Sequence, residues 1–420
     1  MLRSQYVRAF SKQNEFYLVW IIRRRVPMTD RYALDKGRLS SELLLLLTLL
    51  ATDNIDETAD REPELFADID WELFIRLNLH HRIYPFLYPK LSRMREECVP
   101  TLVIQRLKNE YRRNTVQMLQ LSGEMGRIGD ELARLNIRSL FLKGPVLALD
   151  LYGDVSLRTS RDLDFIVPLE QLAETEALLV QLGYVKEEEF ESILGDWKWR
   201  QHHTTFNHSV TSIKVEVHWR LNPAPSKEPD FDELWTRARA SSLGRNVYYL
   251  GKEDLFLFLS AHGSRHGWSR LRWLLDIKQL LAQQPAPGAL IQLLQRYHYS
   301  NMGGQALLLA AALLEAPIDP ALSGLTDSPK AHRLAELSMF YIERLVNLNN
   351  PPLAPEVERH YKYYQPAILT RPQQLLYVLG FLYPYAADAK TLPLPKPLHF
   401  LYFPLRPFLW GWRKAVGADK

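Results

Sequence analysis

The sequence predicts an α+β protein, and three observations lead to this class. Residues 39–120 carry apolar side chains three and four positions apart, the spacing of amphipathic helices, and the pattern returns over residues 252–350. Residues 139–220 instead alternate short apolar segments with helical ones. Such alternation is typical of an α/β or α+β core of about 110 residues. We therefore expect a core that contains a sheet, with helical segments before and after it.

The N-terminal helical part begins at "SSELLLLLTLL" (40–50) and continues through an acidic connector at 54–74. The clearest helix comes later, because its apolar residues keep a spacing of three and four over five steps. They are Met118, Leu121, Met125, Ile128, Leu132 and Leu135. We expect this row of side chains to form the buried face of one amphipathic helix.

The central part is punctuated by glycine and proline. Lys143-Gly144-Pro145 stops the first apolar segment, and Gly183 has the residue type favoured just after a helix. The expected elements are, in order, a strand at 139–142, a helix from 146 to 153, a strand at 163–167, a helix at 169–182, and strands at 204–208 and 213–221.

Changes in pattern along the chain predict five parts. They are a basic N-terminal leader at 1–38, a helical N-terminal region at 39–114, a core at 115–250, a helical C-terminal domain at 251–390 and a basic tail rich in proline and aromatic residues at 391–420. The leader holds nine Lys or Arg and three acidic residues, so a mobile leader, a membrane-surface segment and a misassigned start are all compatible with it.

Composition favours a cytoplasmic protein. The values of 47% hydrophobic and 24% charged residues are those of a folded soluble chain, and the single cysteine, Cys98, rules out an internal disulfide framework. The apolar run at 43–50 is far shorter than the roughly 20 residues of a membrane span. The run at 16–22 is followed by arginines, whereas a secretory signal has its charge in front.

Two further partners are considered from charge. A formal charge of +4 on 420 residues is too small to indicate a nucleic-acid partner by itself. The basic ends carry no motif that recognises bases, so we do not expect a nucleic-acid partner. The tail at 391–420 mixes aromatic and basic side chains, which suits weak contact with a membrane surface. Its prolines oppose a continuous helix, and docking onto the protein's own core is the alternative.

The segment "SLRTSRDLDFIVPLE" (156–170) raises the main functional question. If residues 163–167 form a strand, Asp162 and Asp164 point to one face, while Leu163 and its alternate neighbours point to the core. Two carboxylates this close repel each other, so a positive group should lie between them. A bound metal ion is our interpretation of that group.

Neighbouring motifs extend this interpretation. Glu216 lies on the polar face of the strand expected at 213–221 and supplies a third carboxylate. Lys143 and Gly144 form a turn before a helix, where backbone N–H groups attract phosphate, and Arg158 and Ser160 can bind phosphate oxygens. Three carboxylates beside a phosphate-binding turn are what two Mg²⁺ ions and a nucleotide require.

The order "FLKG…LYGD…LRTSRDLDFIV…LGY…KVEVHW…LSAHGSRHGWSRLRWLLDI" resembles the uncharacterised nucleotidyltransferase family of the DNA polymerase β-like superfamily, over about residues 115–285. The resemblance implies a polymerase-β-like nucleotidyltransferase core, a mixed sheet with flanking helices. It implies metal binding by Asp162, Asp164 and Glu216, although the third acid is usually aspartate in the superfamily. Lys143 and Gly144 match the turn, and a histidine in the family pattern places His203 near substrate or phosphate.

The expected reaction is Mg²⁺-dependent transfer of an NMP group from an NTP to an acceptor hydroxyl, with release of pyrophosphate. The acceptor would be a small molecule or a protein. The alternative is a non-catalytic nucleotide-binding sensor or an interaction scaffold that keeps the fold.

Other side chains have structural alternatives. Arg158 could pair with Asp154 or Asp162, and Asp276 lies four residues after Arg272, which favours a pair within one helix. A set of clustered histidines suggests zinc, but no cysteine or regular ligand spacing accompanies them, so we do not expect a zinc site. They are His202, His203, His208 and His218.

Overall fold

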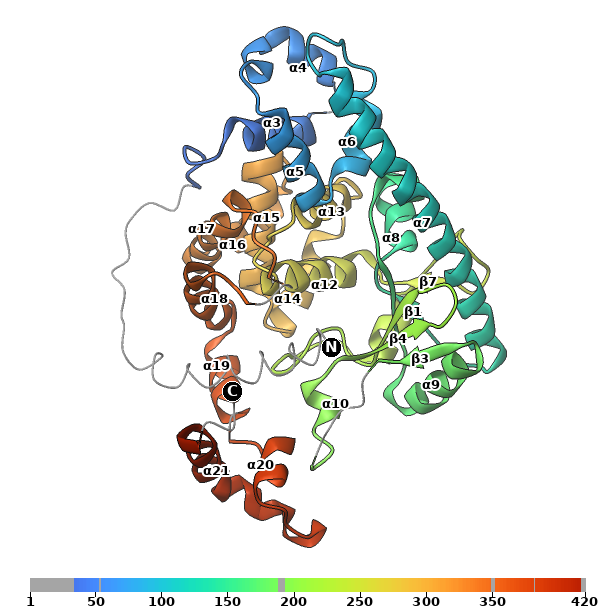
Figure 1. Ribbon diagram of the computed structural model, residues 1–420, viewed down its shortest axis with the longest axis vertical. Coiled ribbons are helices and arrows are strands. Elements are labelled where there is room, and N and C mark those ends of the chain that lie inside the picture. The colour runs from blue at the N-terminus through green and yellow to red at the C-terminus, as the bar shows by residue number, and fades with distance from the viewer. Residues whose placement is uncertain (1–33, 53, 188–192, 349–351, 381, 417–420) are drawn as a thin grey trace.

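The structure is a computed structural model that describes residues 34–52, 54–187, 193–348, 352–380 and 382–416 (Figure 1). Residues 1–33 of the predicted leader, with the apolar run at 16–22, lie outside the described residues. Among the helices that are described, none is both long enough and apolar enough to cross a membrane.

The middle part of the sequence, residues 140–249, forms one mixed sheet with the strand order β3-β4-β5-β2-β1-β7-β6. Its strands are β1 (Leu140–Phe141), β2 (Asp162–Ile166), β3 (Tyr184–Lys186), β4 (His203–His208), β5 (Lys214–His218), β6 (Arg239–Ala240) and β7 (Tyr248–Tyr249). The pairs β2–β5 and β1–β7 are parallel, and the other neighbours are antiparallel. The expected mixed sheet with flanking helices is thereby confirmed. The strands β3, β6 and β7 were not predicted, because segments of two or three residues carry no alternation.

The helices fall into three groups along the chain. Before the sheet are α3 (Ser41–Ala51), α4 (Ile55–Arg61), the 3-10 helix η1 (Pro63–Phe66), α5 (Trp71–His81), α6 (Tyr84–Leu91) and α7 (Thr101–Arg134). Between the strands are α8 (Pro145–Tyr152), η2 (Val155–Leu157), η3 (Leu169–Gln171), α9 (Leu172–Gln181), α10 (Trp197–Arg200) and α11 (Phe231–Thr236). After the sheet are α12 (Lys252–Arg265), α13 (Leu271–Ala282), α14 (Pro287–Arg296), α15 (Ser300–Leu314), η4 (Pro320–Leu322), α16 (Ser323–Thr326), α17 (Pro329–Glu343), α18 (Pro355–Ile368), α19 (Arg371–Gly380), α20 (Ala386–Thr391), η5 (Lys396–Leu401) and α21 (Tyr402–Val416).

One face of the sheet is covered by α7 and α9, and this layer contains the first hydrophobic core (Figure 1). Met118 and Met125 of α7 pack there against Leu163 and Phe165 of β2. The predicted helical row is buried from Met118 to Leu132, but Leu135 is 41% exposed because the helix has ended at Arg134. Packing on this face leaves the opposite face of β2 and β5 for polar side chains.

The second core joins the helices before the sheet to those after it. Leu46 of α3, Leu274 of α13 and Leu307 of α15 belong to one buried cluster. The helix α7 continues through residues 114 and 115, where a boundary was predicted, and Figure 1 shows it running from the N-terminal helices to the sheet. The predicted parts thus share cores and a helix, and their boundaries stay a prediction.

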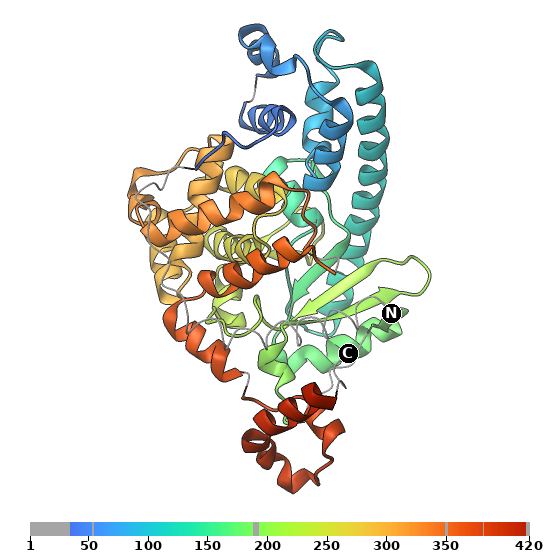
Figure 2. The same ribbon diagram turned by 60° about the vertical axis from the view of Figure 1, so that its left-hand side comes forward.

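The C-terminal tail forms a small lobe with α20, η5 and α21, at the bottom of both ribbon views (Figure 2). Asp388 is fully buried there and accepts hydrogen bonds from Arg406 and Arg413. The prolines were expected to oppose a continuous helix, but α21 continues through Pro407. The large aromatic side chains of Phe408 and Trp412 are 75% and 65% exposed, and contact with a membrane surface stays a prediction.

Candidate active site

Asp162, Asp164 and Glu216, the acid cluster, lie on two neighbouring parallel strands. The register of β2 with β5 pairs Asp164 with Glu216 and Asp162 with Lys214. Their alternate neighbours, such as Leu163 and Val217, are fully buried in the core under α7 and α9. Since side chains alternate along a strand, the acids face the side of the sheet that this core leaves free. The three predicted acids are therefore adjacent in space.

The turn after β1 brings Lys143 and Gly144 to the same place. Lys143 Nζ lies 3.0 Å from Asp164 Oδ1, and the lysine side chain is 16% exposed. Gly144 has φ +84°, a conformation that other residues rarely adopt, and it precedes α8 without a side-chain cap. Its Cα faces the backbone of β2, since a Cβ added there would lie 3.6 Å from the carbonyl oxygen of Asp162. The start of α8 thus opens beside the acid cluster.

Further cations and imidazoles surround the carboxylates. Lys214 Nζ donates to Glu216 Oε1 at 2.6 Å, and His203 Nε2 lies 3.7 Å from Glu216 Oε2. His218 Nε2 lies 3.4 Å from Asp164 Oδ1. Side chains of the protein therefore supply part of the positive charge expected between the acids. From the sequence, this charge was assigned to a metal ion alone.

These neighbours divide the three acids into two electrostatic classes. Burial and the negative charges of Asp164 and Glu216 raise the pKa of Asp162. Burial alone would also raise the pKa of Asp164, but Lys143 and His218 outweigh it and hold that pKa well below its usual range. Burial likewise opposes the lowered pKa of Glu216, which results from His203, Lys214 and Lys143. Asp164 and Glu216 are thus stabilised as anions, whereas Asp162 is strained as one.

The acid cluster has the donor set of a cation site. Asp164 Oδ2 is buried and makes no hydrogen bond with the described residues. Carboxylate oxygens of Asp164 and Glu216 and a ring nitrogen of His218 lie within 4.8 Å of one another. A buried carboxylate oxygen without a donor is costly unless a cation binds it, so these residues fit a divalent metal ion.

Ser160 and Arg158 are engaged by other groups. Ser160 Oγ donates to the carbonyl oxygen of Asp162 at 3.1 Å, so it supports the start of β2. The guanidinium of Arg158 is 1% exposed and binds Asp276 bidentately, through Nε to Oδ1 at 2.8 Å and Nη2 to Oδ2 at 2.9 Å. This arrangement favours a structural role for Arg158 over the predicted phosphate contact.

The ion pairs considered from the sequence are replaced by this long-range pair. Arg158 reaches Asp276, 118 positions away, where Asp154 and Asp162 were the expected partners. Asp276 also accepts from Tyr152, while Arg272 donates to Thr159 instead. The predicted pair of Arg272 with Asp276 within one helix is therefore wrong, because the packing of α13 against the loop before β2 offers better partners.

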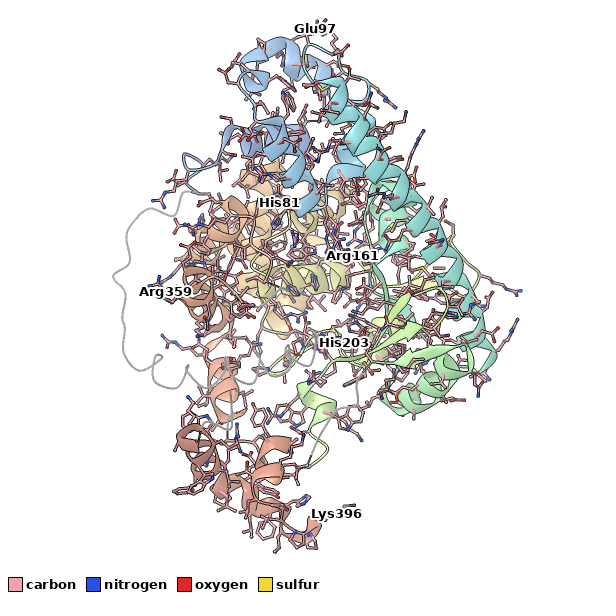
Figure 3. All side chains as sticks on the ribbon, viewed as in Figure 1. His81, Glu97, Arg161, His203, Arg359 and Lys396 are labelled. Atoms are coloured by element: carbon pink, nitrogen blue, oxygen red, sulfur yellow. The ribbon has the colours of Figure 1, made fainter. Side chains whose placement is uncertain are left out.

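Three of the four clustered histidines meet at the site. Ring nitrogens of His202, His203 and His218 lie within 4.8 Å of one another, and Figure 3 places His203 at the inner end of the sheet. Burial lowers the pKa of His203 to about 4, so its imidazole is neutral at pH 7. His208 instead packs against Tyr184. Sequence reasoning gave His218 and Lys214 no role beside the acids, although their alternation with Glu216 was the available signal.

A comparison with protein families agrees with this geometry. A family model described as uncharacterised nucleotidyltransferase matches residues 67–315, more than half of the chain. The chain belongs to this family. Neither a search of curated proteins nor a search of solved structures gave a significant match.

The family match is longer than the resemblance read from the motifs. It begins in the N-terminal helical region, before α5, and ends just after α15, so it includes helices on both sides of the sheet. The acid cluster and the turn at Lys143 both lie inside it. Family membership supports nucleotidyl transfer in general terms and leaves the metal, the acceptor and the products open.

Proposed function

We propose that the protein is a Mg²⁺-dependent nucleotidyltransferase that transfers an NMP group from an NTP to an acceptor hydroxyl and releases pyrophosphate. One observation carries the proposal. Three carboxylates from adjacent parallel strands converge on the free face of the sheet, beside a Lys-Gly turn at the start of a helix. This combination places metal-binding oxygens next to a site for phosphate.

The residues of the acid cluster would hold two Mg²⁺ ions. When bound, these ions supply Lewis-acid activation of the attacking hydroxyl and neutralise charge on the leaving group. The unpartnered Asp164 Oδ2 supports the fit, as does the pKa of Asp162, which its carboxylate neighbours and burial raise. Both features describe oxygens that gain stability from a cation.

The remaining residues would bind and orient the nucleotide. Lys143 Nζ can turn from Asp164 to a phosphate oxygen, since its neighbouring helix start presents N–H groups to the same space. Gly144 lets this backbone approach closely. Glu216 would receive the acceptor proton, and the neutral imidazole of His203, 3.7 Å away, can take it on.

A second candidate, a nucleotide-binding sensor or scaffold without transfer, is favoured by a different observation. Lys143 and Lys214 lie within 3.0 Å of Asp164 and Glu216, respectively, so the site is largely charge-balanced by its own side chains. Such a site folds without metal and could report on nucleotide alone. An NTP as partner and a cytoplasmic location belong to the proposal in both cases, whereas a small-molecule or protein acceptor belongs to the enzyme alone.

The test is incubation of the full chain with each α-labelled NTP and Mg²⁺, with either a small-molecule extract or a protein extract as acceptor. We expect labelled product or self-labelling together with pyrophosphate release for one nucleotide. Asp162→Asn and Glu216→Gln should each abolish the label, whereas Glu174→Gln, an exposed change on α9, should not. Nucleotide binding without label or pyrophosphate under all conditions would support the sensor and contradict the enzyme.

A further inference from the structure

Four arginines lie on three segments that meet beside the acid cluster, and we call these four residues the arginine cluster. They are Arg82, Arg161, Arg270 and Arg272. Arg82 directly follows α5, and Arg161 directly precedes Asp162. Arg270 directly precedes α13, which contains Arg272. Three segments far apart in the sequence thus each contribute positive charge to one place.

Hydrogen bonds join these segments. Arg270 donates to the carbonyl oxygen of His80, and the backbone N–H of Leu271 donates to His81 Nδ1 at 3.3 Å, so the end of α5 touches the start of α13. Arg272 Nη1 donates to Thr159 Oγ1 at 2.7 Å, which ties α13 to the loop before the acids. In the view of Figure 3, Arg161 lies between His81 and His203.

Among the described residues, the arginine cluster has no carboxylate in direct contact. Within the described ranges, no carboxylate lies within ion-pair distance of any of the four guanidinium groups, although the nearby Arg158 binds Asp276 through two hydrogen bonds. Arg272 is 8% exposed, and its Nε is buried without a partner. Unpaired cations this close repel each other, and their burial is costly unless an anion binds them.

Burial and neighbouring positive charges lower the pKa values of three of these arginines. Burial, followed by the charge of Arg161, lowers the pKa of Arg82. Burial and the neighbouring arginines lower the pKa of Arg270 to about 10 and that of Arg272 to about 9. Asp162 opposes this lowering of the pKa at Arg82 and Arg272 but does not outweigh burial and the neighbouring arginines.

Solvent reaches Arg161 from the side of α7. Arg161 is exposed and lines a groove of about 550 Å³ together with Arg112, Arg113 and the turn between β4 and β5. The register of β2 with β5 places Asp162 opposite Lys214, next to this turn. Arg161 thus joins this groove to the arginine cluster, and the next residue in the chain is Asp162, which we assign to metal.

We propose that the arginine cluster binds a chain of phosphates, and that this chain is the β- and γ-phosphates of the nucleotide. Guanidinium groups bind phosphate oxygens bidentately, and four of them from three segments offer enough donors and positive charge for more than one phosphate. This inference rests on the proposed function and assigns the position of the leaving group. A phosphorylated acceptor has the same chemistry and is the other possible source of the phosphates.

The first experiment measures binding of inorganic tripolyphosphate to the full chain by calorimetry without metal. Arg82→Gln and Arg161→Gln should each lower the affinity about tenfold, equal to about 1.4 kcal/mol. Arg76→Gln is the matched control, because Arg76 is exposed on the same helix as Arg82. An unchanged affinity in both variants, or an equal loss in the control, would overturn the proposal.

A melting curve without anion separates binding from a structural role. Removing one of several repelling charges should leave the melting temperature unchanged or raise it, while the shift caused by tripolyphosphate shrinks. A melting temperature that falls in both variants, with the tripolyphosphate shift intact, would mean that the arginines serve the fold and would refute the pocket.

The source of the phosphates follows from a comparison of ligands in the same variants. With Mg²⁺, ATP binding should weaken about tenfold, whereas binding of AMP and of a sugar monophosphate should not change. Loss of sugar monophosphate binding with ATP unaffected would overturn the assignment to the nucleotide. If tripolyphosphate binding depends on the arginines but no NTP binds, the proposed function fails, whereas phosphate binding by the arginine cluster is supported. If NTPs bind and react but the variants bind tripolyphosphate as tightly as the wild type, the proposal for the arginine cluster fails and the proposed function stands.

Discussion

The acid cluster and the arginine cluster meet at residues 161 and 162, but they differ in how their charges are balanced. Asp164 and Glu216 each have a lysine within 3.0 Å, supplied by the sheet or the turn beside it. The arginines come from helices and a loop, and among the described residues they have no carboxylate partner. Two of the three acids are thus compensated by lysines of the protein, whereas the arginine cluster needs an anion from outside.

This contrast teaches that charge alone does not identify a ligand site. Asp164 is the most buried of the acids and also the best compensated, so its removal should harm the fold. Asp162 and the arginine cluster are poorly compensated, so their removal should harm binding and spare the fold. Three experiments test this division, and the largest effect is expected first.

Asp164→Asn should lower the free energy of unfolding of the metal-free protein by about 3–5 kcal/mol, because the largely buried Lys143 loses the carboxylate that lies 3.0 Å from its Nζ. The same loss should be partly reversed by Lys143→Met in the same chain, since the stranded charge is then removed as well. Urea unfolding of the two single variants and the double variant measures this coupling. A single variant as stable as wild type would show that the lysine does not stabilise the carboxylate.

Asp162→Asn together with Asp164→Asn should abolish the stabilisation by Mg²⁺ and nucleotide, which at a hundred times Kd is worth about 2.7 kcal/mol in the wild type. The baseline stability of the variant falls for the reason given above, so each ligand shift is compared with its own ligand-free melting curve. Tripolyphosphate should still raise the melting temperature, because the arginine cluster is intact. A full Mg²⁺–nucleotide shift in the variant would contradict a metal site at these acids.

Asp162→Asn alone should have the smallest effect, a change within about 1 kcal/mol that favours the variant, because it removes a carboxylate repelled by two others. The pKa of Asp162 is raised on folding, so its charge costs stability at neutral pH and ceases to do so below the usual value of 3.8, where both states are protonated. The gain over wild type should therefore be complete at pH 7 and disappear as the pH falls below that value. A loss of stability that is equal at all pH values would mean that the carboxyl makes a structural contact.

Local patterns determined the sheet and the acids. Alternation along β2 and β5 was sufficient to assign the buried and the polar face of each strand. A shift of one residue would turn every apolar side chain to the other face, so one assignment alone places them in the core. The spacing in α7 predicted its buried row for the same reason. Glycines at 144, 153 and 183 all have positive φ, and two of them end helices where the sequence predicted an end. The site acids needed only these short-range rules and the resemblance of their motifs.

The tertiary structure alone decided which partners the charged residues take. Arg158 pairs with Asp276 rather than with the nearer Asp154 or Asp162, and Lys143 compensates Asp164 across the β1–β2 connection. The arginine cluster joins residues about 80 and 110 positions apart, and no local periodicity encodes such a contact. Sequence patterns report which face of an element is buried, but the choice among distant partners depends on how the elements pack. For this protein, that packing brings a cluster of unpaired cations to the edge of a cluster of acids.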